Sequence, residues 1–538
     1  MEQYVLRDWR MGRLGFRPSR WIPSGLLALA ALAQQASRQQ PEPILKYIRS
    51  TWTVLTRSNR HLAQAAPDPK FRHLSDGRWP VYLPQDEDRK ALETQLRHEL
   101  SPRDFETIDL LSLPADPRQI HDAGLLYLPH PYVVPGGRFN EMYGWDSYFI
   151  QLGLLRDHED GLARDMVENL LYEIRHYGKI LNANRSYYLT RSQPPFLTEM
   201  LLAVYERSHD RQWLADSVPA LESYYRYWTS EPHLTVRTGL SRYYDLGKGP
   251  APEAAAERDL QGRSHYDRVK SYFRRRSLTD PELSRYYDAS GDRLTALFYQ
   301  GDRSMRESGF DPSDRFGPFG VEVIEFDPVC LNSLLYVMET QAADILRLLG
   351  RTADEGIWRQ RAADRAERIN RLMWDEGDGL YYDYNFVQHR RRQYPFLTTF
   401  YPLWAGIATP EQAARVAHAL PLFEESGGLR TSTQHTGNQW DAPFGWAPLE
   451  LLAVEGLRRY GYNQDADRIA TKFLSLVLGQ YRKAGTIVEK YDVVLRRSDL
   501  EGEIQFGYGS NERGFGWTNA VYTALLDQLP RREAAGLQ

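Results

Sequence analysis

Residues 135–148 read PGGRFNEMYGWDSY, and they combine one Arg, one Glu, one Asp and four aromatic rings in fourteen positions. Because glycine is costly inside a helix, the pair Gly136–Gly137 predicts a loop over the first half of this stretch. Aromatic faces stack on sugar rings, and Arg and carboxylate groups hydrogen-bond hydroxyls, so the loop is suited to a pocket wall. A surface loop whose rings anchor it to the core is the alternative, and the stretch alone favours neither.

The rest of the chain shows mainly helical periodicity. Apolar residues recur at i, i+3 and i+4 spacing in seven long segments, whereas convincing strand patterns are few and short. Helical pairs recur every 30–50 residues or so without a sequence repeat, which argues against a short-period solenoid. These patterns predict one all-α domain with helices over Leu162–Tyr177, Phe196–Arg207, Trp213–Trp228, Leu331–Leu349, Trp358–Trp374, Pro448–Tyr460 and Asp465–Lys483.

Two segments depart from the helical pattern. Pro69–Gln119 is polar with weak periodicity and is interpreted as an inserted cap, and Gly247–Arg276 is interpreted as a long loop. Loops of that length in a compact domain are usually functional. We therefore divide the chain into residues 1–120, a helical N-terminal extension with a polar insertion, and residues 121–538, the main helical domain.

Composition restricts the partners and the location. The chain of 538 residues has a net charge of −4, so it lacks the basic surface that nucleic acid or an anionic membrane would require. Its one cysteine, Cys330, permits no disulfide framework or cysteine metal cluster. The apolar run Gly25–Ala33 is too short to span a bilayer. It favours an N-terminal helix of a cytoplasmic protein, and a signal segment over residues 1–36, with export to the periplasm or medium, is the alternative.

Four further loops resemble the first in composition. They mix acidic, basic and aromatic residues, and no phosphate-binding glycine loop, metal-ligand spacing or nucleophile elbow competes with them. Five such loops in one helical chain make a common pocket the better interpretation. The four loops are residues 182–195, residues 307–316, residues 439–446, and residues 488–492 taken with 514–519.

The motifs in these loops resemble the signatures of the trehalases, glycoside hydrolase family 37. PGGRF-x-E-x-Y-x-WD-x-Y at 135–148 and QWD-x-P-x-GW at 439–446 match the two family patterns, and SG-x-D-x-S-x-R at 308–315, EKYDV at 489–493 and GFGWTN at 514–519 extend the likeness over roughly residues 125–525. The resemblance implies an (α/α)6 barrel (a six-hairpin toroid). It also implies hydrolysis of an α-glucosidic bond with inversion, on a small sugar substrate and without metal or cofactor.

Two carboxyl groups carry that chemistry. Inverting hydrolysis needs an acid and a base about 6.5–9.5 Å apart, one protonated and one ionised. By motif, Asp311 matches the family's general acid, whose pKa Phe310 and other apolar neighbours would raise, and Glu489 matches the base, whose charge Lys490 would favour. The resemblance also implies substrate-binding roles for Arg138, Phe139, Tyr143, Trp145, Asp146, Asn182, Arg191, Ser192, Gln193, Gly309, Trp440, Asp441, Tyr508 and Trp517.

Three departures from the family pattern concern the leaving-group side of the site. Ala251–Pro252–Glu253 stands where the family has Arg-Pro-Glu, so an expected substrate-binding Arg is absent. Residues 501–513 lack the glycine run of the family lid, and Tyr508 stands about where an acid is expected. The acid loop reads GFDPSDR rather than GWDFSSR.

These departures leave several functions open. Trehalose is the first substrate to consider. The same chemistry on another α-glucobiose, or on a glucoside or mannoside of a small polyol or hydroxy acid such as glycerate, is the main alternative. A phosphorylase or a non-catalytic sugar-binding protein is more remote, because both carboxylates are present. The sequence does not indicate the oligomeric state.

Overall fold

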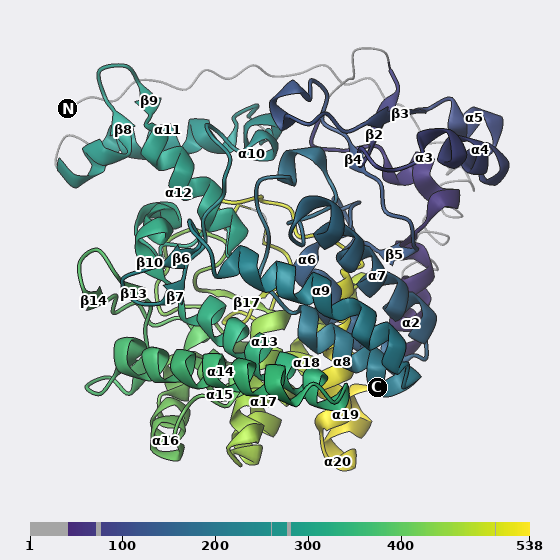
Figure 1. Ribbon diagram of the computed structural model, residues 1–538. Coiled ribbons are helices and arrows are strands. Elements are labelled where there is room, and N and C mark those ends of the chain that lie inside the picture. The colour runs from purple at the N-terminus through teal and green to yellow at the C-terminus, as the bar shows by residue number, and fades with distance from the viewer. Residues whose placement is uncertain (1–40, 72–76, 260, 277–280, 501) are drawn as a thin grey trace, which may run out of the picture. The chain divides into compact units, whose positions relative to one another are not determined.

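The computed structural model describes residues 41–71, 77–259, 261–276, 281–500 and 502–538 (Figure 1). Residues 43–538 form one compact unit. The predicted N-terminal helix at Gly25–Ala33 and the signal-like segment 1–36 lie outside the described residues. The division proposed between residues 120 and 121 falls inside the compact unit, and it stays a prediction.

Six helices form a closed inner ring. Each contacts the next around the ring, and the packing of the last helix against the first closes it. Going around, the ring consists of α6 (Gly144–Arg156), α8 (Leu197–Ser208), α13 (Val329–Leu348), α15 (Tyr401–Ala405), α17 (Ala447–Arg459) and α19 (Gly516–Gln528).

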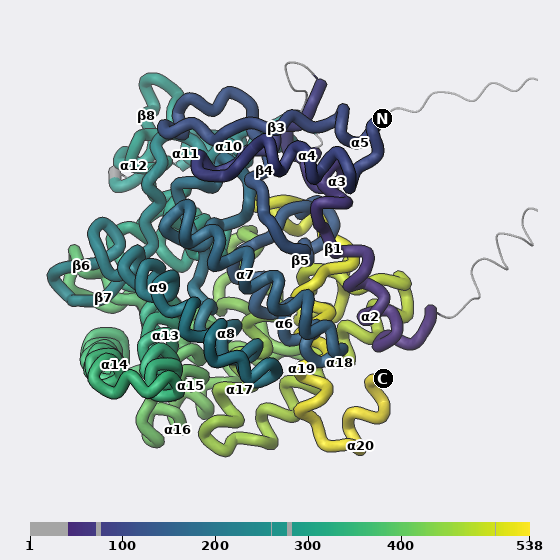
Figure 2. The backbone as a smooth tube through the Cα atoms, turned by 45° about the vertical axis from the view of Figure 1, so that its right-hand side comes forward, coloured from purple at the N-terminus to yellow at the C-terminus, as the bar shows by residue number. Residues whose placement is uncertain are grey.

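An outer layer of helices surrounds this ring (Figures 1 and 2). Five of its members directly follow an inner helix in the chain, and the sixth comes from the N-terminal side and packs against α19. This paired arrangement confirms the expected all-α (α/α)6 barrel. The outer helices are α7 (Asp160–Tyr177), α9 (Arg211–Trp228), α14 (Thr352–Met373), α16 (Pro410–His418), α18 (Asn463–Ala484) and α2 (Ile44–Leu55). All seven helices predicted from periodicity are present.

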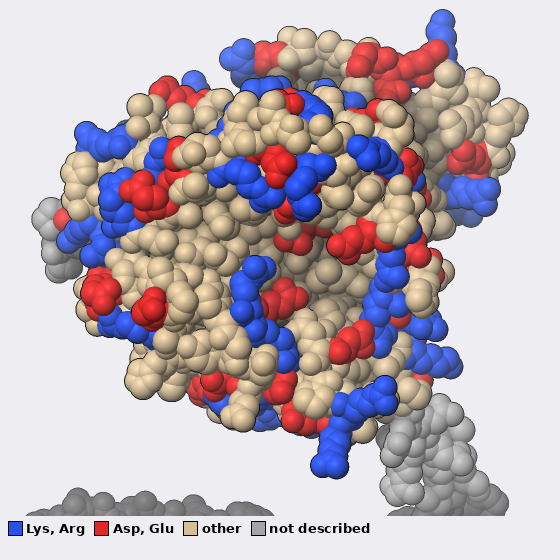
Figure 3. Space-filling view, turned by 60° about the horizontal axis from the view of Figure 1, so that its bottom comes forward, with Lys and Arg blue, Asp and Glu red and all other residues tan. Residues whose placement is uncertain are grey.

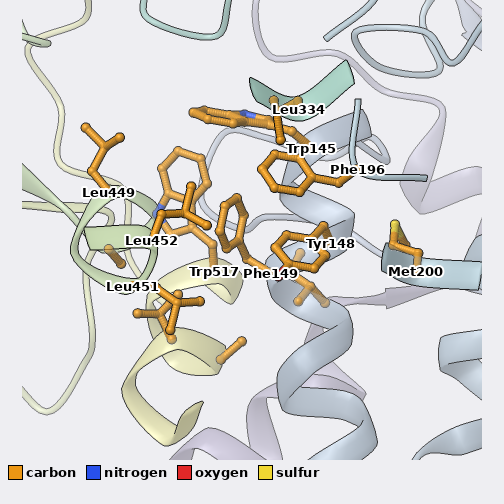
Figure 4. Close-up of a cluster of buried hydrophobic side chains, with 14 of the residues drawn as sticks. Trp145, Tyr148, Phe149, Phe196, Met200, Leu334, Leu449, Leu451, Leu452 and Trp517 are labelled. Atoms are coloured by element: carbon orange, nitrogen blue, oxygen red, sulfur yellow. The ribbon is translucent and has the colours of Figure 1, made fainter. Parts of the chain in front are cut away.

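The inner helices are buried on nearly every side. In α6, only Leu152 and Arg156 have more than slight exposure. An inner helix contacts both ring neighbours, an outer helix and the barrel axis, so it lacks the single apolar stripe of a surface helix. Figure 4 shows the core that results, in which Trp145 and Phe149 from α6 lie beside Leu452 from α17 and Trp517 from α19.

The polar segment before the barrel contains a folded βαβ unit, which the sequence analysis did not predict. β2 (Trp79–Leu83) pairs in parallel with β3 (Ile108–Ser112) and with β4 (Leu125–Leu126), and α4 (Arg89–Glu99) connects the first two strands. Parallel neighbours require such a crossover connection. The weak helical periodicity of this segment therefore reflects its parallel strands.

The other described strands form short antiparallel ribbons at the ends of the helices. They pair β1 (Thr56–Arg57) with β5 (Tyr132–Val133), β6 (Leu234–Thr235) with β7 (Leu240–Ser241), β8 (Tyr287–Asp288) with β9 (Arg293–Leu294), β13 (Tyr384–Asn385) with β10 (Phe326–Asp327) and β14 (Arg390–Arg391), β11 (Trp374–Asp375) with β12 (Leu380–Tyr381), β15 (Glu424–Glu425) with β16 (Gly428–Leu429), and β17 (Phe444–Trp446) with β18 (Lys490–Asp492).

The prediction of a long loop over Gly247–Arg276 is wrong. This segment folds into α10 (Pro252–Ala256) and α11 (His265–Arg276). Tyr266, Val269 and Phe273 of α11 form one buried stripe, and they belong to a second hydrophobic core that includes Phe506 from the C-terminal part of the chain. The helix pair thus packs against the loop that contains Tyr508.

The described surface agrees with the charge balance of the sequence. On the face in Figure 3, basic and acidic side chains are interspersed, without the broad basic patch typical of nucleic-acid binding. Among the described helices, none is both long and apolar enough to cross a membrane.

Candidate active site

Most of the predicted pocket loops lie directly before inner helices. Residues 135–143 precede α6, residues 182–196 precede α8, residues 439–446 precede α17, and residues 514–515 precede α19. Side chains from all four of these loops or from the first turns that follow them line one cavity. The N-termini of these helices add partial positive charge near the cavity.

All but two of the predicted site residues line this cavity. They come from segments far apart in the sequence, and the barrel brings them together. The lining includes Arg138, Phe139, Tyr143, Trp145, Asp146, Asn182, Arg191, Gln193, Gly309, Asp311, Trp440, Glu489, Tyr508 and Trp517.

Three indoles form the aromatic part of the wall. The ring centroid of Trp145 lies 5.9 Å from that of Trp440 and 5.8 Å from that of Trp517. Trp440 in turn stacks face to face on Trp446, with 3.8 Å between centroids. Because each ring packs against another, the indoles are held in fixed orientations, and they can offer apolar faces to a sugar ring.

Asp311 follows α12 (Ala296–Glu307) on the acid loop, next to Phe310, whose ring packs among the indoles of the wall. Phe310 contacts both Trp145 and Trp440, with centroids 5.6 and 5.1 Å away. Burial raises the pKa of Asp311 to about 7, although the nearby guanidinium of Arg306 acts in the opposite direction. A carboxyl group with this pKa keeps its proton near neutrality and can donate it.

Glu489 is buried directly before β18. The pairing of β17 with β18 places Trp446 opposite Lys490, so the second signature segment supports the loop of this carboxylate. Lys490 Nζ lies 3.1 Å from Glu489 Oε2, and the Tyr508 hydroxyl donates to Oε1. Burial raises the pKa of Glu489, whereas these two donors favour its ionised form. Asp146 is also buried close to Glu489 and Asp311, and burial raises its pKa well above the ordinary value.

Two arginines in the wall are held by carboxylates. Arg191 Nη2 donates to Glu253 at 2.5 Å, and Arg138 Nη2 donates to Glu257 at 2.8 Å. Arg191 Nε and Nη1 and the second Glu253 oxygen are buried without a hydrogen-bond partner. Arg191 Nη1 lies 3.6 Å from Asp245 Oδ2, so two carboxylates hold the Arg191 guanidinium at the cavity wall.

Ser192 and Asp441 do not line the cavity, contrary to the sequence-based expectation. The Ser192 amide donates to Glu307 Oε1 at 2.9 Å. Asp441 accepts hydrogen bonds from the hydroxyls of Ser432, Thr436 and Tyr394 and from the Asp314 amide. Both residues thus fix the positions of the loops that carry the site.

Sequence reasoning missed several residues of the cavity wall. The most informative is Arg306, whose Nη1 lies 3.5 Å from Asp311 Oδ2. Arg306 supplies a guanidinium to the cavity wall, whereas Ala251 is buried and does not line the cavity. The one sequence feature that could have indicated Arg306 is its position five residues before Asp311. The others are Lys70, Pro135, Tyr188, Glu253, Ala254, Glu257 and Phe515.

The fold and the site together define a class of protein. A double ring of helices that gathers paired carboxyl groups, arginines and indoles around one sugar-sized cavity is the architecture of a glycoside hydrolase. The described residues contain no group of three or more His, Cys, Asp or Glu side chains placed to hold a metal ion.

Comparison with known proteins identifies the family. The family model "Trehalase" matches residues 106–530. The chain is 35% identical to the cytosolic neutral trehalase of Emericella nidulans over 91% of its own length and 72% of that protein, and 40% identical to the cytosolic neutral trehalase of Saccharomyces cerevisiae over 74% of its length. The structure of neutral trehalase Nth1 from Saccharomyces cerevisiae superposes with a TM-score of 0.76 at 34% identity, covering 92% of this chain and 95% of that one. The chain belongs to the trehalase family. It spans 57% of the length of the yeast relative found by sequence.

Proposed function

We propose that this chain hydrolyses trehalose with inversion at the anomeric carbon, with Asp311 as the general acid and Glu489 as the general base. The observation that carries the proposal is that both carboxyl groups line one cavity in unlike environments. Burial raises the pKa of Asp311 to about 7, whereas hydrogen bonds from Lys490 and Tyr508 favour the ionised form of Glu489. Unlike environments of this kind separate an acid from a base.

The proposed reaction follows from these positions. Glu489 removes a proton from a water molecule as the water oxygen attacks the anomeric carbon. The bond from that carbon to the glycosidic oxygen breaks, and Asp311 transfers its proton to the leaving oxygen. The indoles of Trp145, Trp440 and Trp517 and the guanidinium of Arg191, which all line the cavity, support binding of the glucosyl ring.

The experiment replaces each carboxyl group by the corresponding amide. We expect Asp311→Asn and Glu489→Gln each to lower kcat for trehalose by at least about 10²-fold while the circular dichroism spectrum shows an intact fold. NMR of the first turnovers is expected to show one β-glucose for each trehalose cleaved. Near-normal turnover in either variant, or release of α-glucose alone, would reject the assignment, and turnover without phosphate would exclude a phosphorylase.

A different leaving group is the second candidate, because Ala251 and Tyr508 mark departures on that side of the site. A panel of α-linked disaccharides and α-glucosides and α-mannosides of glycerol and glycerate tests it. Failure on trehalose with turnover of one of these would change the substrate and keep the mechanism. A cytoplasmic location belongs to the same proposal, and the names of the cytosolic relatives support it.

A further inference from the structure

A second, larger cavity adjoins the candidate active site. Its walls come mainly from the described residues of the α10–α11 segment and from residues 498–500 and 502–513. The residues that line both cavities are Arg138, Ala254, Glu257, Arg306, Asp311 and Tyr508. We call the second space the outer cavity.

The position of the two carboxyl groups orients the outer cavity relative to the reaction. Asp311 lines both cavities, whereas Glu489 lines only the inner one. If Asp311 protonates the leaving oxygen, as the proposed function requires, the bond that breaks lies at the boundary. The leaving-group side of a bound ligand therefore faces the outer cavity, and this step rests on the proposed function.

The lining of the outer cavity is strongly basic. It includes seven arginines and four acidic residues. Two of those acidic residues are already paired, since Glu257 binds Arg138 and Asp259 binds Arg263 at 3.0 Å. A third, Asp311, has a pKa of about 7 and is protonated over part of its population near neutrality.

Four of these arginines have no carboxylate within ion-pair distance among the described residues: Arg258, Arg268, Arg275 and Arg513. Arg268 donates instead to the backbone carbonyls of Gln505 at 3.0 Å and Gly507 at 2.8 Å, and its Nε is buried without a partner. Arg258 donates only to the backbone carbonyls of Ala255 and Glu257. A concave wall with this excess of one charge attracts and concentrates ligands of the opposite charge.

We infer that the outer cavity binds a phosphate group, either free or carried by a sugar whose ring occupies the boundary with the active site. Guanidinium groups match the geometry of phosphate oxygens in pairs, and their charge is permanent. A neutral disaccharide carries no charge that would balance these four guanidinium groups. A sugar phosphate with its ring at the boundary would occupy residues that line both cavities, so it would act as a competitive inhibitor or as a charged substrate.

The test measures binding directly and does not depend on turnover. Isothermal titration calorimetry of the full chain compares glucose 6-phosphate, glucose and inorganic phosphate. The variant Arg258→Gln/Arg275→Gln removes two exposed guanidinium groups from the wall. Arg274→Gln is the matched control, because Arg274 lies on the same helix but pairs with Asp292 at 2.5 Å and does not line the cavity.

We expect glucose 6-phosphate to bind at least about tenfold more tightly than glucose, and the double variant to lose about tenfold in affinity for it. The control should stay within about twofold of the parent. If inorganic phosphate binds as tightly as glucose 6-phosphate, the occupant is free phosphate, and the inference that the outer cavity binds a phosphate group is supported. Equal affinity for glucose and both phosphates, or an unchanged double variant, would overturn the inference. Failure of trehalose hydrolysis alone would refute the proposed function and leave this binding result intact.

Discussion

The pKa of Asp311 gives the sharpest test of the site, through the substitution Arg306→Met. Arg306 lies on the last turn of α12, where Asp302 accepts two hydrogen bonds from its guanidinium at 3.1 Å each. Its Nη1 atom is 3.5 Å from Asp311 Oδ2. The guanidinium stabilises the ionised acid and lowers its pKa, against the larger raising effect of burial. Methionine keeps the apolar stem and removes the charge.

The expected size of the effect follows from that distance. Two unit charges 3.5 Å apart interact by about 5 kcal/mol at an effective dielectric constant near 20, which would correspond to a pKa change of about 3.5. The real change is smaller, because the side chain of Asp311 is 33% exposed and Asp302 shares the same guanidinium. Measured effects of one neighbouring charge are about 1–3 in pKa. We therefore expect the pKa of Asp311 to rise from about 7 to about 8 or above.

The sign of this change can be read in a pH profile. A general acid must be protonated, so activity falls as pH rises through its pKa, and a higher pKa moves that alkaline limb to higher pH. The profile of kcat/KM reports the free enzyme. Arg306→Lys, which keeps the charge, is the control and should leave the limb near its original place. Overall activity will also fall, because Arg306 lines the cavity. An alkaline limb of Arg306→Met at or below that of the parent would refute the reasoning.

Three further predictions concern the base, a buried ion cluster and the core. Tyr508→Phe removes a hydrogen-bond donor that favours the ionised form of Glu489, so the pKa of Glu489 should rise. The acidic limb of the kcat/KM profile should then move to higher pH while the alkaline limb stays in place, and an acidic limb that does not move would contradict this. Glu141→Gln removes the nearer of the two carboxylates that pair with the buried cations Lys70 and Arg185, the other being Asp68, and should cost about 3–5 kcal/mol in urea unfolding. Leu452→Ala in the barrel core should cost about 2–5 kcal/mol, against less than about 0.5 kcal/mol for the exposed Leu422→Ala.

The barrel could be predicted from the sequence because its long helices have regular apolar spacing. The short helix α11 was missed for a physical reason. Its twelve residues include five Arg or Lys, which obscure the stripe of Tyr266, Val269 and Phe273. The stripe packs against Phe506 and Phe319, which come from other parts of the chain. A local pattern does not contain that information.

The candidate site divides in the same way. Most of the predicted residues that line the cavity lie in loops before the inner helices or in the first turns of those helices, whereas Asp311 follows α12 and Glu489 directly precedes β18. Each lies in a segment that a motif marks. Glu257 and Lys70 line the same cavity, but they come from the α10–α11 segment and the N-terminal segment, which no motif marks. Their role depends on tertiary contacts such as the pair between Arg138 and Glu257.

This division explains why the departures from the family pattern gather on one side. The proposed glycosyl wall includes residues such as Trp145 and Trp517, which also pack the core of the ring, so a change there would disturb the barrel. The proposed leaving-group side is lined by residues of α10, α11 and the loop of Tyr508, and these elements share a second hydrophobic core of their own. That side can change its charge and shape while the ring stays intact. Three features lie on this side: Ala251 in place of an arginine, the guanidinium of Arg306, and the basic outer cavity. Together they indicate that the leaving group bound here differs from the one that the family pattern implies.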